Sequence, residues 1–147
     1  MTTREIVVDD HVLLRMLLDD EPIDLRANGA KISTTGLWYH RLCRALVAST
    51  VTGVYSRSLG SADPLLGERA LRAVLELPDT IGLVSLRDVA WPMAALLGSG
   101  VRLNLMSLEA LAAAQHLGAE ICLAAIDANP PLIAAAVATG TSIRLIA

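Results

Sequence analysis

The sequence lacks the patterns that mark zinc-binding, disulfide-rich and membrane-spanning proteins. Its two cysteines, Cys43 and Cys122, are far apart and form no CxxC pair, so we expect buried free thiols rather than a zinc site or a disulfide framework. The longest uncharged stretch, 128–143, has roughly sixteen residues and contains Pro130-Pro131, whereas a transmembrane helix needs about twenty apolar residues. The first residues also lack the pattern of a signal peptide. We therefore expect a soluble, cytoplasmic protein.

Lysine is nearly absent, and one long segment has no acidic residue. No aspartate or glutamate lies between Arg26 and Asp63. The cations inside that segment are Lys31, which is the only lysine of the chain, Arg41, Arg44 and Arg57. The segment either faces a phosphate backbone or forms an ordinary solvated helix face. The net charge of −3 gives the whole chain no attraction for nucleic acid, so only local charge can favour such binding.

The length and the apolar content suit one domain with a large core. The chain has 147 residues, of which 54% are hydrophobic and 18% are charged. This apolar content is high for a soluble protein. It favours either a parallel sheet that is buried on both faces or an oligomer interface.

Four short apolar segments and the weaker segment KIST predict β-strands, and segments with helical periodicity separate them. The strands are predicted at 4–8, 31–34, 81–86, 120–125 and 142–146. The helices are predicted at 12–17, 36–47, 64–75, 88–97, 108–117 and 132–138, with Ser107 as the N-cap of the fifth helix and a loop at 56–63. Strands that alternate with helices imply a parallel sheet with helices on both faces. The sequence therefore predicts one domain, residues 1–147, that forms a three-layer α/β/α sandwich with a central parallel sheet of four or five strands.

The adjacent acids Asp9 and Asp10 follow the first predicted strand, where the chemistry of open α/β sheets is concentrated. The segment IVVDDHVLLRMLL resembles the start of receiver domains, in which an acidic pair binds magnesium. A receiver also needs a phosphoacceptor aspartate after its third strand and a lysine after a later one. No aspartate lies near Val54, and Lys31 is too early to be that lysine. The receiver therefore remains a remote alternative.

The C-terminal third carries the most specific motif. There the chain reads SLEALAAAQHLGAEICLAAIDANPPLIAAAVATG, and the first strand runs into VVDDHVLLRMLL. Over essentially its full length the chain resembles PIN domains, which are best known from the VapC-type toxin nucleases. The resemblance implies a PIN-like fold, a metal-dependent endoribonuclease of the toxin–antitoxin type, and a catalytic carboxylate cluster formed by Asp9, Glu109 and Asp127.

Carboxylates that converge on one point suit Mg²⁺ or Mn²⁺, which can activate water for attack on a phosphodiester. Asp10, otherwise the expected N-cap of the first helix, and His40 are candidate auxiliary ligands. The resemblance further implies RNA as the substrate, a small antitoxin protein as a partner, and a homodimer. In this interpretation Arg41 and Arg44 contact the RNA phosphates.

The chain departs from the family pattern where the second acid is expected. The segment TTGLWYHRLCRAL holds no carboxylate, Glu109 stands where aspartate is usual, and Ala125 replaces a threonine. Each acid of the predicted cluster also suits a purely structural role, as a helix cap, in a first helical turn or in a loop. The alternative hypothesis is therefore a catalytically inactive PIN-like module that serves binding or scaffolding.

Overall fold

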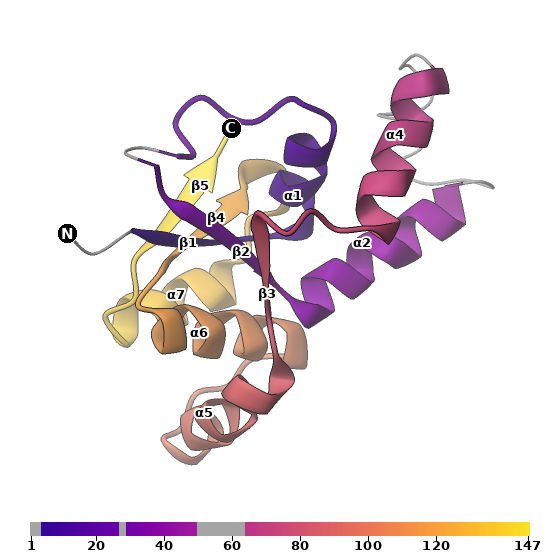
Figure 1. The fold of residues 1–147 in the computed structure, drawn as a ribbon. Helices are drawn as coiled ribbons and strands as arrows, with labels where there is room; N and C mark the ends of the chain where they lie inside the picture. Colours follow the sequence, from indigo (N-terminus) through magenta and orange to yellow (C-terminus); the bar gives the residue numbers. More distant parts are fainter. Residues whose placement is uncertain (1–3, 27–28, 50–63) are drawn as a thin grey trace.

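The protein forms a five-stranded parallel sheet with helices on both faces, as a computed structural model that describes residues 4–26, 29–49 and 64–147 shows (Figure 1). The strands are β1 (Glu5–Val8), β2 (Lys31–Thr35), β3 (Ile81–Val84), β4 (Glu120–Ala124) and β5 (Ile143–Ile146). The helices are α1 (Asp10–Leu17), α2 (Gly36–Ser49), α4 (Pro64–Leu75), α5 (Leu86–Gly98), α6 (Leu105–Leu117), η1 (Ala125–Asp127) and α7 (Pro130–Ala138). The predicted loop at 56–63 and Arg57 lie outside the described residues.

The strand order is β3-β2-β1-β4-β5, and all neighbouring strands are parallel. This confirms the predicted three-layer α/β/α fold with a central parallel sheet. The five predicted strands agree with the observed ones closely at their starts. β3 is shorter than predicted and ends at Val84, because the side chain of Ser85 accepts a hydrogen bond from the backbone N–H of Arg87 and so begins α5.

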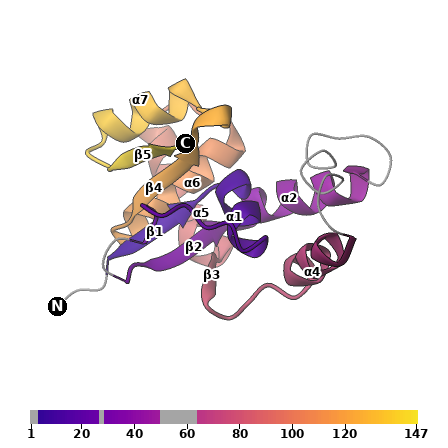
Figure 2. The ribbon, with the colours of Figure 1, turned by 90° about the horizontal axis from the view of Figure 1, so that it is seen from above.

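The apolar surplus of the sequence fills two cores, one on each face of the sheet. Alternate residues of β1 point to opposite sides, so Val7 packs with α5, α6 and α7 while Ile6 and Val8 pack with α1, α2 and α4. Figures 1 and 2 show these two helical layers and the central sheet, with α2 and α4 side by side at one end. Burial on both faces is the outcome expected of a parallel sheet.

The two cysteines are free, as predicted, but only one is fully buried. Cys122 lies in β4 within the core, and this burial raises the pKa of its thiol to about 11. Cys43 is half-buried on α2. None of the helices in the described part of the chain combines the length and the apolar character that crossing a membrane requires.

The start of α6 differs from the prediction. Ser107 was expected as the N-cap, but the helix begins at Leu105 and its cap is Asn104, whose side chain accepts a hydrogen bond from the backbone N–H of Ser107 at 2.8 Å. Ser107 thus lies in the first turn, where its hydroxyl accepts a 2.7 Å hydrogen bond from Nδ2 of Asn129. The amide of Asn129 also caps α7, so one contact joins the beginnings of α6 and α7.

The order of the strands reverses between β1 and β4. The chain moves outward on one side from β1 through β2 to β3, and on the other side from β4 to β5. In open parallel sheets the crevice outside the carboxyl ends of the strands at such a point is the usual ligand site. The segments that leave β1 and β4 here are α1 and η1, which carry Asp10 and Asp127.

Candidate functional site

Asp9 joins the two central strands at their carboxyl ends. One carboxylate oxygen accepts a hydrogen bond from the backbone N–H of Val12, and the other accepts one from the backbone N–H of Ala124, both at 2.9 Å. Asp9 is therefore the N-cap of α1, a structural role for which the sequence pattern offers both Asp9 and Asp10. Burial raises the pKa of Asp9 to about 6, even though these two hydrogen bonds favour the charged form; the neighbouring charge of Asp10 raises this pKa further.

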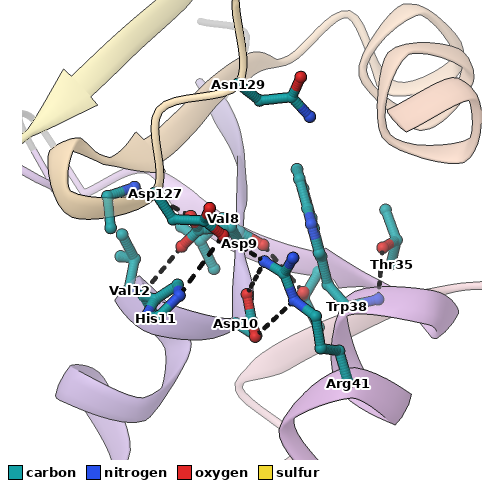
Figure 3. Close-up of polar contacts among 12 residues, drawn as sticks. Val8, Asp9, Asp10, His11, Val12, Thr35, Trp38, Arg41, Asp127 and Asn129 are labelled. Atoms are coloured by element: carbon teal, nitrogen blue, oxygen red, sulfur yellow. Dashed lines mark hydrogen bonds and ion pairs between the residues drawn. The ribbon is translucent and has the colours of Figure 1, made fainter. Parts of the chain in front are cut away.

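Asp10 lies in the first turn of α1, and its partner is Arg41 of α2. The Asp10 side chain is fully buried. Nε of Arg41 donates to Oδ2 of Asp10 at 2.8 Å, and Nη2 of Arg41 donates to Oδ1, which gives a two-pronged ion pair (Figure 3). The α2 segment lacks the carboxylate that the family pattern predicts. It instead provides a cation, Arg41, which faces the acids of the site.

Asp127 brings a second carboxylate to the same guanidinium. Its Oδ2 accepts a hydrogen bond from Nη2 of Arg41 at 2.9 Å and lies 3.4 Å from Nε2 of His11 (Figure 3). One donor atom from each of Asp10, His11 and Asp127 lies within 4.8 Å of the other two, and this is the group of potential metal ligands found among the described residues. Asp127 was predicted as a ligand and Asp10 as an auxiliary one.

The sequence pattern assigns no role to His11. It directly follows Asp10 in the turn that leaves the first strand, and this adjacency was the one available signal. The contact with Asp127 depends on how α1 and η1 meet, which the sequence pattern does not specify.

Glu109 lies away from this group and contacts the start of α2. Its side chain is buried, and Oε1 accepts a 2.8 Å hydrogen bond from the backbone N–H of Leu37, one of the helix-terminal N–H groups that have no partner within the helix. A Cβ on Gly36 would lie 3.7 Å from Oε2. Glu109 thus caps the start of α2 from its position on α6. Its predicted role as a metal ligand stays a prediction.

A pair of substitutions tests whether Glu109 holds the start of α2 through its hydrogen bond or through its charge. Glu109→Gln keeps an oxygen for the N–H of Leu37, whereas Glu109→Ala leaves that N–H unsatisfied and opens a cavity. We expect Glu109→Ala to lower the free energy of unfolding by about 1–3 kcal/mol and Glu109→Gln to lower it by less. Urea denaturation measures both. Equal losses in the two variants would mean that the carboxylate charge, rather than the hydrogen bond, holds α2.

A pocket of about 280 Å³ opens beside these residues. Asp9, Asp127, Arg41 and Trp38 line one part of it, and the starts of α6 and α7 line another. The residues from the two helix starts are Asn104, Met106, Ser107, Asn129 and Pro130. Helix N-termini and a guanidinium favour an anion, while the carboxylates favour a cation, so the pocket suits a cation and a phosphate together.

The remaining predicted residues, His40 and Arg44, are exposed on α2 and lie outside the residues that line this pocket. Arg44 belongs to the basic segment of the sequence, and its contact with RNA phosphates stays a prediction. His40 is likewise outside the potential ligand group formed in the described part of the chain. Its predicted role as an auxiliary ligand stays a prediction.

The chemistry of the group fits a divalent ion. Two carboxylates and an imidazole are ligands for Mn²⁺, and the carboxylates also suit Mg²⁺. The guanidinium of Arg41 already satisfies one oxygen of Asp127 and both oxygens of Asp10. A metal ion therefore fits these ligands in competition with Arg41.

Comparisons with known proteins support the fold. No family model matches the chain, and no curated protein matches its sequence. A chain in the 2.2 Å resolution structure of VapBC-1 from nontypeable Haemophilus influenzae is similar in structure, with a TM-score of 0.51 and 11% sequence identity over 95% of this chain and 96% of that chain. At this identity the similarity concerns the fold alone. The protein therefore has the PIN-like three-layer fold that its sequence predicts.

Proposed function

We propose that this chain is a divalent-metal-dependent endoribonuclease of the toxin–antitoxin type. The observation that carries the proposal is the group of Asp10, His11 and Asp127, whose donor atoms lie within 4.8 Å of one another at the reversal point of the sheet. The fold similarity to VapBC-1 and the sequence resemblance to VapC-type toxins support it. Asp10 and Asp127 are the proposed metal ligands, and His11 completes them.

Two of the originally predicted ligands, Asp9 and Glu109, act mainly by positioning in this proposal. Asp9 fixes the start of α1 against β4, so it sets the place of Asp10 and His11. Glu109 fixes the start of α2 and therefore the helix that carries Arg41. Asp9 also lines the pocket beside the ligand group, whereas Glu109 is not among its lining residues.

A bound Mg²⁺ or Mn²⁺ would activate a water molecule and neutralise the charge that develops on the phosphate. The chain itself supplies the phosphate site, which lies in the pocket between Arg41 and the starts of α6 and α7. The imidazole of His11 favours Mn²⁺ over Mg²⁺, because magnesium prefers oxygen ligands. Mn²⁺ is therefore the best probe. An antitoxin partner, a homodimer and RNA as the substrate belong to the same proposal.

The test compares the wild type with Asp127→Asn. Asp127 is half-exposed, so its substitution spares the core. Because an ion that binds only the folded state stabilises it, we expect millimolar Mn²⁺ to raise the melting temperature of the wild type and to have little effect on Asp127→Asn. Cleavage of a single-stranded RNA should require Mn²⁺ and be lost in the same variant. Asp88→Asn, which changes an exposed acid on α5, serves as the matched control.

The absence of both a Mn²⁺-dependent shift and RNA cleavage in the wild type would reject the ribonuclease. The second candidate function would then hold, namely a PIN-like module that binds without catalysis. One observation favours it: Arg41 forms ion pairs with both Asp10 and Asp127, so these carboxylates have a counterion without a metal ion. Metal-independent RNA binding that is weakened by Arg41→Gln would support this module.

A further inference from the structure

Arg41 occupies the position that a cation shared by two carboxylates would take. Its Nη2 donates to Oδ1 of Asp10 and to Oδ2 of Asp127, so both oxygens point at one nitrogen (Figure 3). Three separate segments meet at this contact, because Asp10 comes from α1, Asp127 from η1 and Arg41 from α2. Both carboxylates belong to the group of potential metal ligands.

The burial of Asp10 explains why a counterion is needed there. Its side chain is fully buried, and a buried carboxylate is costly unless a cation pairs with it. Asp127 provides a second carboxylate nearby, and its negative charge repels that of Asp10. The guanidinium of Arg41 forms ion pairs with both carboxylates and so offsets part of their negative charge without a metal ion. A divalent ion bound to the same oxygens would repel this guanidinium.

The Arg41 side chain also has an alternative position, in the pocket, when an ion binds. Its side chain is one-third exposed and already lines the pocket into which the starts of α6 and α7 open. Rotation of a long, partly exposed side chain costs little compared with the repulsion between a guanidinium and a divalent ion a few Å apart. The helix starts favour a phosphate in the pocket, and the guanidinium can pair with that phosphate there.

We infer, on the basis of the metal-dependent function proposed above, that Arg41 is a built-in counterion which a divalent metal ion must displace from Asp10 and Asp127. The contact holds the site closed at low metal concentration and makes the metal affinity of the wild type weak. Metal binding then turns the guanidinium from the carboxylates toward the pocket. The fold thus contains its own inhibitory cation.

The first experiment measures Mn²⁺ binding by isothermal titration calorimetry to the wild type, Arg41→Gln and Arg44→Gln. A guanidinium that contacts both carboxylates repels a divalent ion bound to the same oxygens, so we expect removal of Arg41 to tighten Mn²⁺ binding by about tenfold or more. Arg44→Gln removes an exposed charge from the same helix and should bind Mn²⁺ like the wild type. Equal or weaker binding by Arg41→Gln would overturn the inference.

A second experiment uses the wild type, because Arg41→Gln leaves a buried carboxylate that can impair folding. The Nε–H of Arg41 donates to Asp10 and should exchange slowly with water in the metal-free protein. In NMR spectra of ¹⁵N-arginine-labelled protein, assigned with Arg41→Lys, saturating Mg²⁺ should abolish this protection. A protected Nε–H at saturating Mg²⁺ would overturn the inference.

The two proposals fail in different ways. If the wild type binds Mn²⁺ and cleaves RNA but Arg41→Gln binds no more tightly, the ribonuclease stands and the counterion role falls. If the wild type neither binds Mn²⁺ nor cleaves RNA while Arg41→Gln binds Mn²⁺, the counterion role stands and the wild-type ribonuclease falls. Failure of both proteins to bind Mn²⁺ overturns the counterion role as well.

Discussion

Trp38→Ala is expected to lower the free energy of unfolding by about 3–5 kcal/mol, the range for deletion of a buried aromatic side chain. Trp38 is only 3% exposed and belongs to the core beneath α5, α6 and α7, although it starts from α2. Trp38 therefore connects the two helical layers beside the pocket. Its removal would leave a cavity between α2 and the core formed by α5, α6 and α7. Urea denaturation followed by circular dichroism measures the change.

The second tryptophan of the chain is a natural control. Trp91 on α5 is 81% exposed, so Trp91→Ala should change stability by no more than about 0.5 kcal/mol. The two residues should also differ in fluorescence. In Trp91→Ala the remaining emission should resist quenching by acrylamide, and in Trp38→Phe it should be quenched readily. Strong quenching of Trp38 in folded protein would contradict its burial.

Asp9→Asn is expected to remove a component of stability that depends on pH, with an amplitude of about 3 kcal/mol. The pKa of Asp9 is raised by burial from 3.8 to about 6 in the folded state. Between about pH 4 and pH 6 the folded protein therefore retains a proton that the unfolded chain has released. Because the folded state binds more protons in this window, the contribution of Asp9 to stability is greatest below pH 4, falls as the pH rises, and is constant above about pH 6.

The measurement is urea denaturation of the wild type and Asp9→Asn at several pH values from 4 to 7. The free energy of unfolding of the wild type, minus that of Asp9→Asn, should fall as the pH rises from 4 to 6. The variant also loses one acceptor, because its amide NH₂ faces the N–H of Val12 or Ala124, but this loss does not vary with pH. For Asp88→Asn, at an exposed position, the difference in free energy of unfolding from the wild type should not change with pH. A flat difference for Asp9→Asn as well would show that its pKa is ordinary.

The sequence was sufficient for the fold because four of the five strands are short apolar runs with clear boundaries, whereas β2, which reads KISTT, has a weaker pattern. Lys31 begins β2 and Gly118 ends α6 in the left-handed conformation, so both positions are defined by local chemistry. The error at the start of α6 has a local reason. Asn104 and Ser107 are both good caps, and the choice between them depends on the contact of Ser107 with Asn129, which comes from a distant part of the chain.

The site could be predicted only in part. The strand ends and the topology placed Asp9, Asp10 and Asp127 at one edge of the sheet, as the parallel arrangement requires. The partners of these acids could not be predicted, because they depend on how α2 packs against α1 and η1. An arginine on an amphipathic helix has the same local sequence pattern whether it faces solvent, RNA or a carboxylate, and only the folded arrangement shows that Arg41 faces Asp10.

The central position of β1 has a consequence for the order of folding. Its contact with β2 through the hydroxyl of Thr34 and the carbonyl of Val8 joins residues 26 positions apart, whereas the bond from the N–H of Ala124 to Asp9 spans 115 positions. Contacts of such long range slow folding, and during synthesis β1 must wait until β4 has been made before the two strands can pair. A nascent chain that ends before Asp127 can therefore hold no assembled site, so any activity of this protein would begin only after Asp127 has been synthesised.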